Sequence, residues 1–117
     1  MMQSPGGEAL ALLGLAARAG AVVAGTQRVR EALRDGHVRF AIVAGDASEN
    51  SRDRIVPALV DRGVPVTAAF DRTRLGAAIG RSAVSAIGVT DGSFARRLLG
   101  LMGEGAGIEP RARRDGR

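Results

Sequence analysis

The apolar residues of the chain change their spacing along its length and predict helices that alternate with strands. Between Glu8 and Ala19, leucine and alanine recur every three or four residues, which is the spacing of one helix face. Apolar runs at 21–24, 38–44, 64–69 and 83–89 are too short for typical helices, so we expect strands there. Helices are predicted at 8–19, 26–35, 48–62, 71–79 and 93–102.

The residues that flank these segments are typical of helix ends. Thr26 is the expected N-cap of the second helix, and Gly36 suits the left-handed position that ends it. Asp71 or Thr73 is the expected cap of the fourth helix, and Asp91 is the expected cap of the last. Pro57 lies well inside the third helix and predicts a kink or a late start, because proline lacks the N–H of a helical hydrogen bond.

The order of these elements predicts the fold class. Strands are connected through single helices, which is typical of an α/β fold, here a three-layer α/β/α sandwich with a four-stranded mixed sheet. The 117 residues fit one domain. We expect a flexible leader at 1–7, the domain at 8–102 and a disordered, arginine-rich tail at 103–117, where apolar residues are few.

Charge narrows the class of partner. The chain carries 17 Lys and Arg residues against 12 acidic ones, a net charge of +5, and every one of the 17 is arginine. Arginine binds phosphate through paired N–H groups and stacks on bases, which favours a polyanionic partner. The absence of cysteine excludes disulfides and thiolate zinc sites. Without a signal-peptide pattern or an apolar stretch of about 20 residues, we expect a cytoplasmic protein with no membrane association.

Few side chains suit catalysis. His37 has no second histidine or cysteine with which to form a metal site, and its place after a helix indicates a surface residue or a helix-end contact. Asp46, Asp71 and Asp91 each follow a strand, where carboxylates cap helices or, in a phosphotransfer enzyme, bind Mg²⁺. We therefore expect a non-catalytic binding protein without a metal or cofactor, with magnesium-dependent phosphotransfer as an alternative.

The segment that begins the second helix suits an anionic ligand. Gly25 opens this helix, and the first N–H groups of a helix have no partner within it and attract negative charge. Gln27, Arg28 and Arg30 add side chains that suit phosphates and base edges. This segment predicts nucleic-acid binding.

Five sequence segments together carry a family resemblance. Leu-Leu-Gly-Leu-Ala-Ala-Arg-Ala-Gly, Ala-Gly-Thr, Ile-Val-Ala-Gly-Asp-Ala-Ser, Leu-Gly-Ala-Ala-Ile-Gly and Val-Thr-Asp-Gly-Ser-Phe-Ala stand at 12–20, 24–26, 42–48, 75–80 and 89–95. With this series the chain resembles the bacterial YlxQ-type proteins of the kink-turn-binding ribosomal protein superfamily over roughly residues 8–102. The resemblance implies an α/β/α sandwich that binds structured RNA without catalysis.

The resemblance also implies a binding face. In the kink-turn binders a glycine-opened second helix enters the RNA groove, and a Gly-x-Asn-Glu-x-x-Lys motif reads sheared G·A pairs. Gly25 keeps the glycine of that motif, whereas Gln27 replaces its Asn, Arg28 its Glu and Glu31 its Lys. A second family contact, the loop after Leu-Gly-x-Ala-x-Gly, corresponds here to 81–84, where an apolar cover for an extruded nucleotide is expected.

These observations define the predicted site and partner. The RNA-binding residues are expected to be Gly25, Thr26, Gln27, Arg28, Arg30, Glu31, Arg34, Asp46, Ala47, Arg72, Arg81, Ser82 and Ala83, with Val84 as a further apolar candidate. The expected partner is structured RNA, ribosomal RNA or the ribosome first, bound by a monomer. Because Arg28 and Glu31 reverse two charges of the motif, a protein-interaction module that has lost kink-turn recognition is the alternative.

Overall fold

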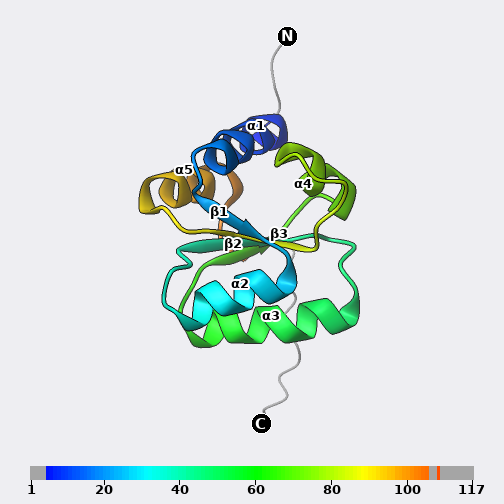
Figure 1. Ribbon diagram of the computed structural model, residues 1–117, viewed down its shortest axis with the longest axis vertical. Helices are drawn as coiled ribbons and strands as arrows, with labels where there is room; N and C mark the ends of the chain where they lie inside the picture. The colour runs from blue at the N-terminus through cyan, green and yellow to red at the C-terminus, as the bar shows by residue number, and fades with distance from the viewer. Residues whose placement is uncertain (1–4, 106–107, 109–117) are drawn as a thin grey trace.

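The computed structural model describes residues 5–105 and Ile108, which form a four-stranded mixed sheet between two layers of helices (Figure 1). Along the chain the elements are α1 (Pro5–Arg18), β1 (Val22–Ala24), α2 (Thr26–Arg34), β2 (Phe40–Val43), α3 (Glu49–Asp61), β3 (Val66–Ala68), α4 (Arg72–Ala78), β4 (Ala86–Val89) and α5 (Gly92–Met102). This architecture confirms the predicted α/β/α sandwich.

The sheet has the strand order β1-β4-β2-β3, so β4, the last strand in the sequence, lies in its interior. β4 runs antiparallel to both of its neighbours, whereas β2 and β3 are parallel. The parallel pair is joined through α3, as a parallel connection requires a crossover. α1, α4 and α5 cover one face of the sheet, and α2 and α3 cover the other (Figure 1).

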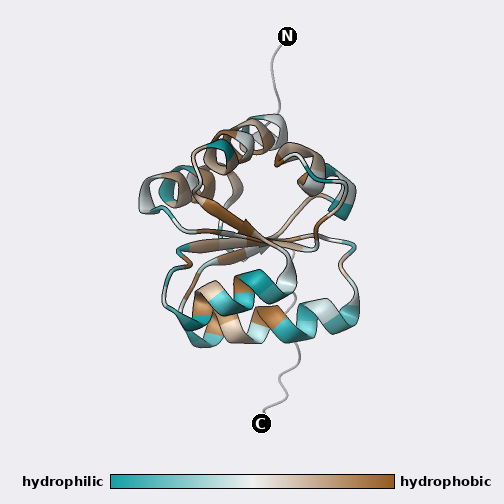
Figure 2. Ribbon diagram, viewed as in Figure 1, coloured by the Kyte–Doolittle hydropathy of each residue, from teal (hydrophilic) through white to brown (hydrophobic). Residues whose placement is uncertain are grey.

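Alternation along β2 supplies both halves of the core. Phe40 and Ile42 face the core under α1, α4 and α5, while Ala41 and Val43 face the core under α2 and α3. Successive side chains of a strand point to opposite faces, so a strand between two helical layers must be apolar throughout. Figure 2 shows this arrangement, with apolar strands in the middle and hydrophilic stretches on α2 and α3.

Several predicted boundaries differ from the structure. α1 begins at Pro5, so residues 5–7 belong to its first turn and not to a leader. Thr26 is the first residue of α2 and not its cap, because Gly25 takes the cap position. The predicted late start of α3 is wrong: Pro57 lies within an exposed part of the helix, where its ring displaces no core side chain. β4 begins at Ala86, because residues 83–85 form part of a loop.

The segment after α5 is also placed in part. The Thr67 hydroxyl donates a hydrogen bond to the Gly103 carbonyl, and the Gly105 N–H donates to the Val66 carbonyl at 2.9 Å. Ile108 packs against the core under α2 and α3. The predicted tail boundary at residue 103 is therefore wrong for these residues, because β3 is an edge strand with free backbone groups to bond. The rest of the predicted tail lies outside the described residues.

Gly76 permits the closest approach between α4 and the loop that follows it. A Cβ atom at Gly76 would lie 2.7 Å from both the Cα and the N of Ala83, and 2.9 Å from the Arg81 carbonyl oxygen. These are backbone atoms, so no side-chain rotation relieves the overlap. The loop 80–85 can fold against α4 only because residue 76 has no side chain.

We predict that Gly76→Ala lowers the free energy of unfolding by about 1–3 kcal/mol, the usual cost of overpacking a closed site. Gly100→Ala in α5 is the matched control, since a Cβ there meets nothing within 4 Å. The control is expected to be neutral or to stabilise by up to about 1 kcal/mol, as alanine does in helices. Urea denaturation measures both, and equal effects of the two substitutions would contradict this account of residue 76.

Candidate nucleic-acid interface

Gly25 joins β1 directly to α2, and because it has no side chain the backbone at the start of the helix is uncovered. Its φ of 100° lies in the region that glycine adopts and other residues rarely do. Its N–H donates to the Ala86 carbonyl at 2.8 Å, and its carbonyl accepts from the Val29 N–H at 2.9 Å. A Cβ at this position would meet nothing within 4 Å, so the backbone is free to approach a ligand.

The start of α2 differs from the starts of the three later helices. Ser48, Asp71 and Asp91 each accept a backbone N–H with a side-chain oxygen and so cap α3, α4 and α5. Gly25 has no side chain and gives α2 no such cap. The first-turn N–H groups of α2 therefore keep their partial positive charge available at the surface. An anion is the ligand that such a helix end favours.

The outer face of α2 carries the predicted polar residues. Val29 and Leu33 are buried on its inner face, and Gln27, Arg28, Arg30, Glu31 and Arg34 are exposed. The Gln27 amide nitrogen donates to a Glu31 carboxylate oxygen at 3.1 Å, which leaves the amide oxygen as an acceptor. Within residues 5–105, none of the three arginines of α2 lies within ion-pair distance of a carboxylate. Their guanidinium groups are available to a phosphate.

Asp46 connects the turn after β2 to the start of α4. Its Oδ1 accepts the Arg72 N–H at 2.8 Å, and its Oδ2 lies 3.5 Å from the Arg72 Nε. The Gly45 N–H donates to the Phe70 carbonyl at 2.7 Å beside this contact. Asp46, like Asp71 and Asp91, is thus bonded to a backbone N–H, which favours the structural interpretation of these carboxylates over a magnesium site.

The loop 80–85 folds back over α4. The Arg81 N–H donates to the Gly76 carbonyl at 2.7 Å, and the Val84 N–H donates to the Arg72 carbonyl at 3.1 Å. Arg81, Ser82 and Ala83 are exposed, whereas Val84 is buried in the core. The expectation that Val84 covers a nucleotide is therefore wrong, because the fold-back turns its side chain inward.

Backbone hydrogen bonds at the start of β4 bring these elements together. The Ser85 carbonyl accepts the Ala44 N–H at 2.9 Å, and the neighbouring Ala86 carbonyl accepts the Gly25 N–H. The first turn of α2, the turn at 44–47, the start of α4 and the loop 81–83 consequently lie at one end of the sheet, on the right of Figure 1. We call this surface the interface.

Not every predicted residue lies at its centre. Gly25, Thr26, Gln27 and Arg28 occupy the first turn of α2, but Arg34 lies at the other end of that helix, about 12 Å along its axis. Arg30 and Glu31 lie between the two ends. Ala47 is half-buried and packs against both halves of the core, so it supports the turn more than it faces outward.

Sequence reasoning missed two contributors to this surface. Arg74 is exposed in the first turn of α4, two residues after Arg72, and adds a cation there. Gly76 shapes the surface by allowing the loop 80–85 to close. The signal for Gly76 was present in the glycine spacing of 75–80, but only its distance from Ala83 shows why glycine is required.

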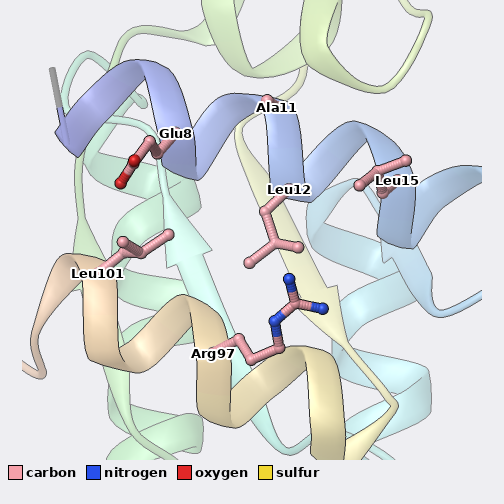
Figure 3. Close-up of a pocket in the computed structure, with 6 residues that line it drawn as sticks. All are labelled: Glu8, Ala11, Leu12, Leu15, Arg97 and Leu101. Atoms are coloured by element: carbon pink, nitrogen blue, oxygen red, sulfur yellow. The ribbon is translucent and has the colours of Figure 1, made fainter. Parts of the chain in front are cut away.

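A separate apolar groove lies between α1 and α5, away from α2. Figure 3 shows Leu12, Leu15 and Leu101 along it, with Glu8 and Arg97 beside them. Leu15 is 48% exposed and Leu101 36% exposed. None of its lining residues belongs to the interface.

Comparison with known proteins decides the family. Residues 8–99 match the model of the ribosomal protein L7Ae/L30e/S12e/Gadd45 family. The chain belongs to this family. The L7Ae-family match spans all five helices except the ends of α1 and α5, and includes every residue of the interface.

Two relatives of the chain are named RNA-binding proteins. The chain is 34% identical over 91 residues to the RNA-binding protein YlxQ of Bacillus subtilis (strain 168), which covers 78% of the chain and 91% of that relative. It is 29% identical over 95 residues to the RNA-binding protein YlxQ of Enterococcus faecium, covering 81% of the chain and 91% of the relative.

Solved structures agree on the fold. A Bacillus halodurans C protein described as having unknown function has a TM-score of 0.77 at 35% identity, covering 80% of this chain and 94% of that one. The Giardia lamblia 15.5kD RNA binding protein has a TM-score of 0.71 at 20% identity, covering 87% and 90%. At 20% identity, the similarity to the Giardia lamblia protein shows a shared fold and nothing more.

The described residues contain neither a metal-binding cluster nor a membrane-spanning helix. Within residues 5–105 and 108, no group of three or more His, Cys, Asp or Glu side chains is placed to hold a metal ion. In the same part of the chain, no helix combines the length and apolar character needed to cross a membrane.

We predict that Asp46→Ala lowers the free energy of unfolding by about 1 kcal/mol, the usual net value of one hydrogen bond, because the Arg72 N–H loses its acceptor. Asp46→Asn is the matched control, since its amide oxygen can accept the same hydrogen bond. The half-exposed ion pair with Arg72 adds little. Urea denaturation separates the two variants, and a loss with Asn as large as that with Ala would show that charge and not the hydrogen bond matters.

Proposed function

We propose that the chain is a non-catalytic RNA-binding protein that binds structured, kink-turn-like RNA through the interface, as a monomer in the cytoplasm and in association with ribosomal RNA. The observation that carries this proposal is the uncapped start of α2 at Gly25. Gly25 is hydrogen-bonded to the start of β4, and the loop before β4 presents Arg81 and is hydrogen-bonded to Arg72. Membership of the L7Ae family and the similarity to two RNA-binding proteins, the YlxQ relatives, support RNA as the ligand.

Phosphate contacts supply most of the binding free energy in this proposal. The N–H groups at the start of α2 donate hydrogen bonds to one phosphate, and the exposed guanidinium groups of Arg28, Arg72 and Arg81 bind others. Each neutralised phosphate of a single strand lowers the slope of log affinity against log salt by about 0.7. The three arginine contacts correspond to a slope of about −2, so affinity falls steeply with salt.

The shape of the RNA supplies the specificity. The major groove of a regular RNA helix is too narrow for side chains, so an exposed helix such as α2 needs a bend, a loop or unpaired nucleotides. There the Arg28 guanidinium can donate to the acceptor edge of guanine, and the Gln27 amide oxygen, free beside its bond to Glu31, can accept from a base. A kink-turn offers both a sharp bend and exposed base edges.

We predict that Arg28→Gln weakens binding to a kink-turn RNA about tenfold, or about 1.4 kcal/mol, because one charge-assisted contact is lost. Arg96→Gln is the matched control, since Arg96 is an exposed arginine of α5 on the other helical layer and the net charge changes equally. Fluorescence anisotropy measures both affinities. An equal loss of affinity for the two variants would mean that the RNA binds elsewhere or that only the net charge of the protein matters.

The type of RNA is tested by titrating a kink-turn RNA and a plain hairpin at two salt concentrations. We expect tighter binding to the kink-turn at both. The double variant Arg28→Glu, Glu31→Lys restores the charges of the motif that the chain resembles and is expected to increase this preference. Equally weak, salt-sensitive binding of the natural sequence to both RNAs would remove kink-turn recognition from the proposal, and no binding at low salt would remove RNA binding altogether.

A further inference from the structure

The groove between α1 and α5 is built by these two helices alone. Its lining residues are Glu8, Ala11, Leu12 and Leu15 of α1 and Arg97 and Leu101 of α5 (Figure 3). Both helices lie in the layer on the side of the sheet away from α2 (Figure 1). The groove has a volume of about 490 Å³ and no third wall among the described elements, so it is open at the surface.

The groove exposes apolar side chains that the fold leaves uncovered. Leu15 and Leu101 are exposed, whereas Leu12 between them is buried in the core. Val60 on α3, in the opposite layer, is the other exposed large apolar residue in the part of the chain that the structure describes. Two of these three exposed residues therefore gather at one groove. Apolar residues gathered in this way are typical of a protein-binding surface.

One carboxylate and one guanidinium group flank these leucines. Figure 3 shows Glu8 beside Leu101 at one end of the groove, and Arg97 beside Leu12 farther along it. Arg97 and Leu101 are four residues apart in α5, so about 6 Å, or roughly one helical turn, separates the two charged positions along the groove. Within residues 5–105, neither Glu8 nor Arg97 lies within ion-pair distance of an opposite charge. Both are available to an occupant of the groove.

Charge and openness argue against RNA and against a small molecule as the occupant. The lining has one acid and one base and so no net charge, unlike a surface that binds phosphates. Small-molecule sites enclose about 70–90% of the surface of their ligand. A groove with walls on two sides only does not enclose a compact ligand, but it suits a long one that lies along both helices.

The shape of the groove also argues against a second copy of the chain. Dimers are most often twofold symmetric, and their interface places the same patch of both copies in contact. Two copies of a groove that face each other leave a space between them, because neither fills the other. The occupant must be convex, and a helix is the convex element that packs between two helices, with its axis about 8–10 Å from each.

We infer that the groove docks an amphipathic helix of another protein. Apolar side chains at positions i, i+3 and i+7 of that helix pack on Leu12, Leu15 and Leu101. A cation and a carboxylate about one turn apart, at the border of its apolar face, pair with Glu8 and Arg97. Docking uses no residue of the interface, so it is compatible with RNA bound there and does not depend on it.

Two labelled helical peptides are the probes that test this docking site. The matched peptide has leucines at positions i, i+3 and i+7, with a lysine and a glutamate four residues apart beside them; the comparison peptide has lysine at both of these positions. Fluorescence anisotropy measures their affinities for the natural full chain and for three variants. Leu15→Ser removes an exposed apolar side chain of the groove, and Val60→Ser, its matched control, removes one outside it. Arg97→Glu makes both charges of the groove negative.

We expect the natural chain to bind the matched peptide about threefold more tightly than the comparison peptide, which is the effect of one partly exposed ion pair. Arg97→Glu should reverse this preference. Leu15→Ser should weaken binding of the matched peptide about tenfold, because the peptide no longer buries that side chain, and Val60→Ser should leave the affinity unchanged. A kink-turn RNA should not displace the peptide.

The inference is overturned if the matched peptide does not bind the natural chain, if Leu15→Ser and Val60→Ser lose affinity equally, or if Arg97→Glu keeps the natural preference. Self-association of the natural chain in sedimentation, abolished by Leu15→Ser, would assign the groove to a second copy and overturn it too. Displacement of the peptide by RNA would assign the groove to RNA, with the same consequence. If the chain binds the peptide but no RNA, the proposed function fails and the docking site stands.

Discussion

The backbone hydrogen bonds at the start of β4 hold the interface together. β4 lies between β1 and β2, so the residues that lead into it meet the ends of both neighbours. Ala86 bonds to Gly25, Ser85 bonds to Ala44, and Val84 bonds to the carbonyl of Arg72. Four segments that are distant in the sequence therefore share one scaffold. Because backbone bonds do not depend on side-chain identity, the side chains on these segments can vary while their arrangement persists.

The two helical layers have different roles around this scaffold. The larger part of the apolar core, including Phe40 and Leu13, lies between the sheet and the layer of α1, α4 and α5. The layer of α2 and α3 contributes an uncapped helix start and three exposed arginines on α2. A glycine in place of a side-chain cap forgoes only a few tenths of a kcal/mol of stability, roughly, which the packing of Val29 and Leu33 helps to offset. That open end is what the proposed function uses.

Local patterns predicted most of the framework. The alternation of apolar spacing predicted the mixed sheet between helices. Asp91 was predicted to be a cap, and Asp71 was predicted to be one with Thr73 as the alternative. Each of the two aspartates accepts the N–H of the third residue after it. Thr26 was wrongly expected to be a cap, since Gly25 already occupies that place with a backbone conformation that composition does not reveal. Val84 was a candidate to cover a nucleotide or to begin the last strand, and it does neither, because it is buried where the loop folds onto α4.

The sequence by itself therefore determined the elements, the apolar faces and the acidic caps, all of which depend on residues a few positions apart. Tertiary structure alone decided which loops meet and where the chain goes after α5. The bond from Asp46 to Arg72 joins residues 26 apart, and that from Thr67 to Gly103 joins residues 36 apart. No local periodicity encodes such pairs, because they form only when the sheet has ordered its strands and the two helical layers have packed against it.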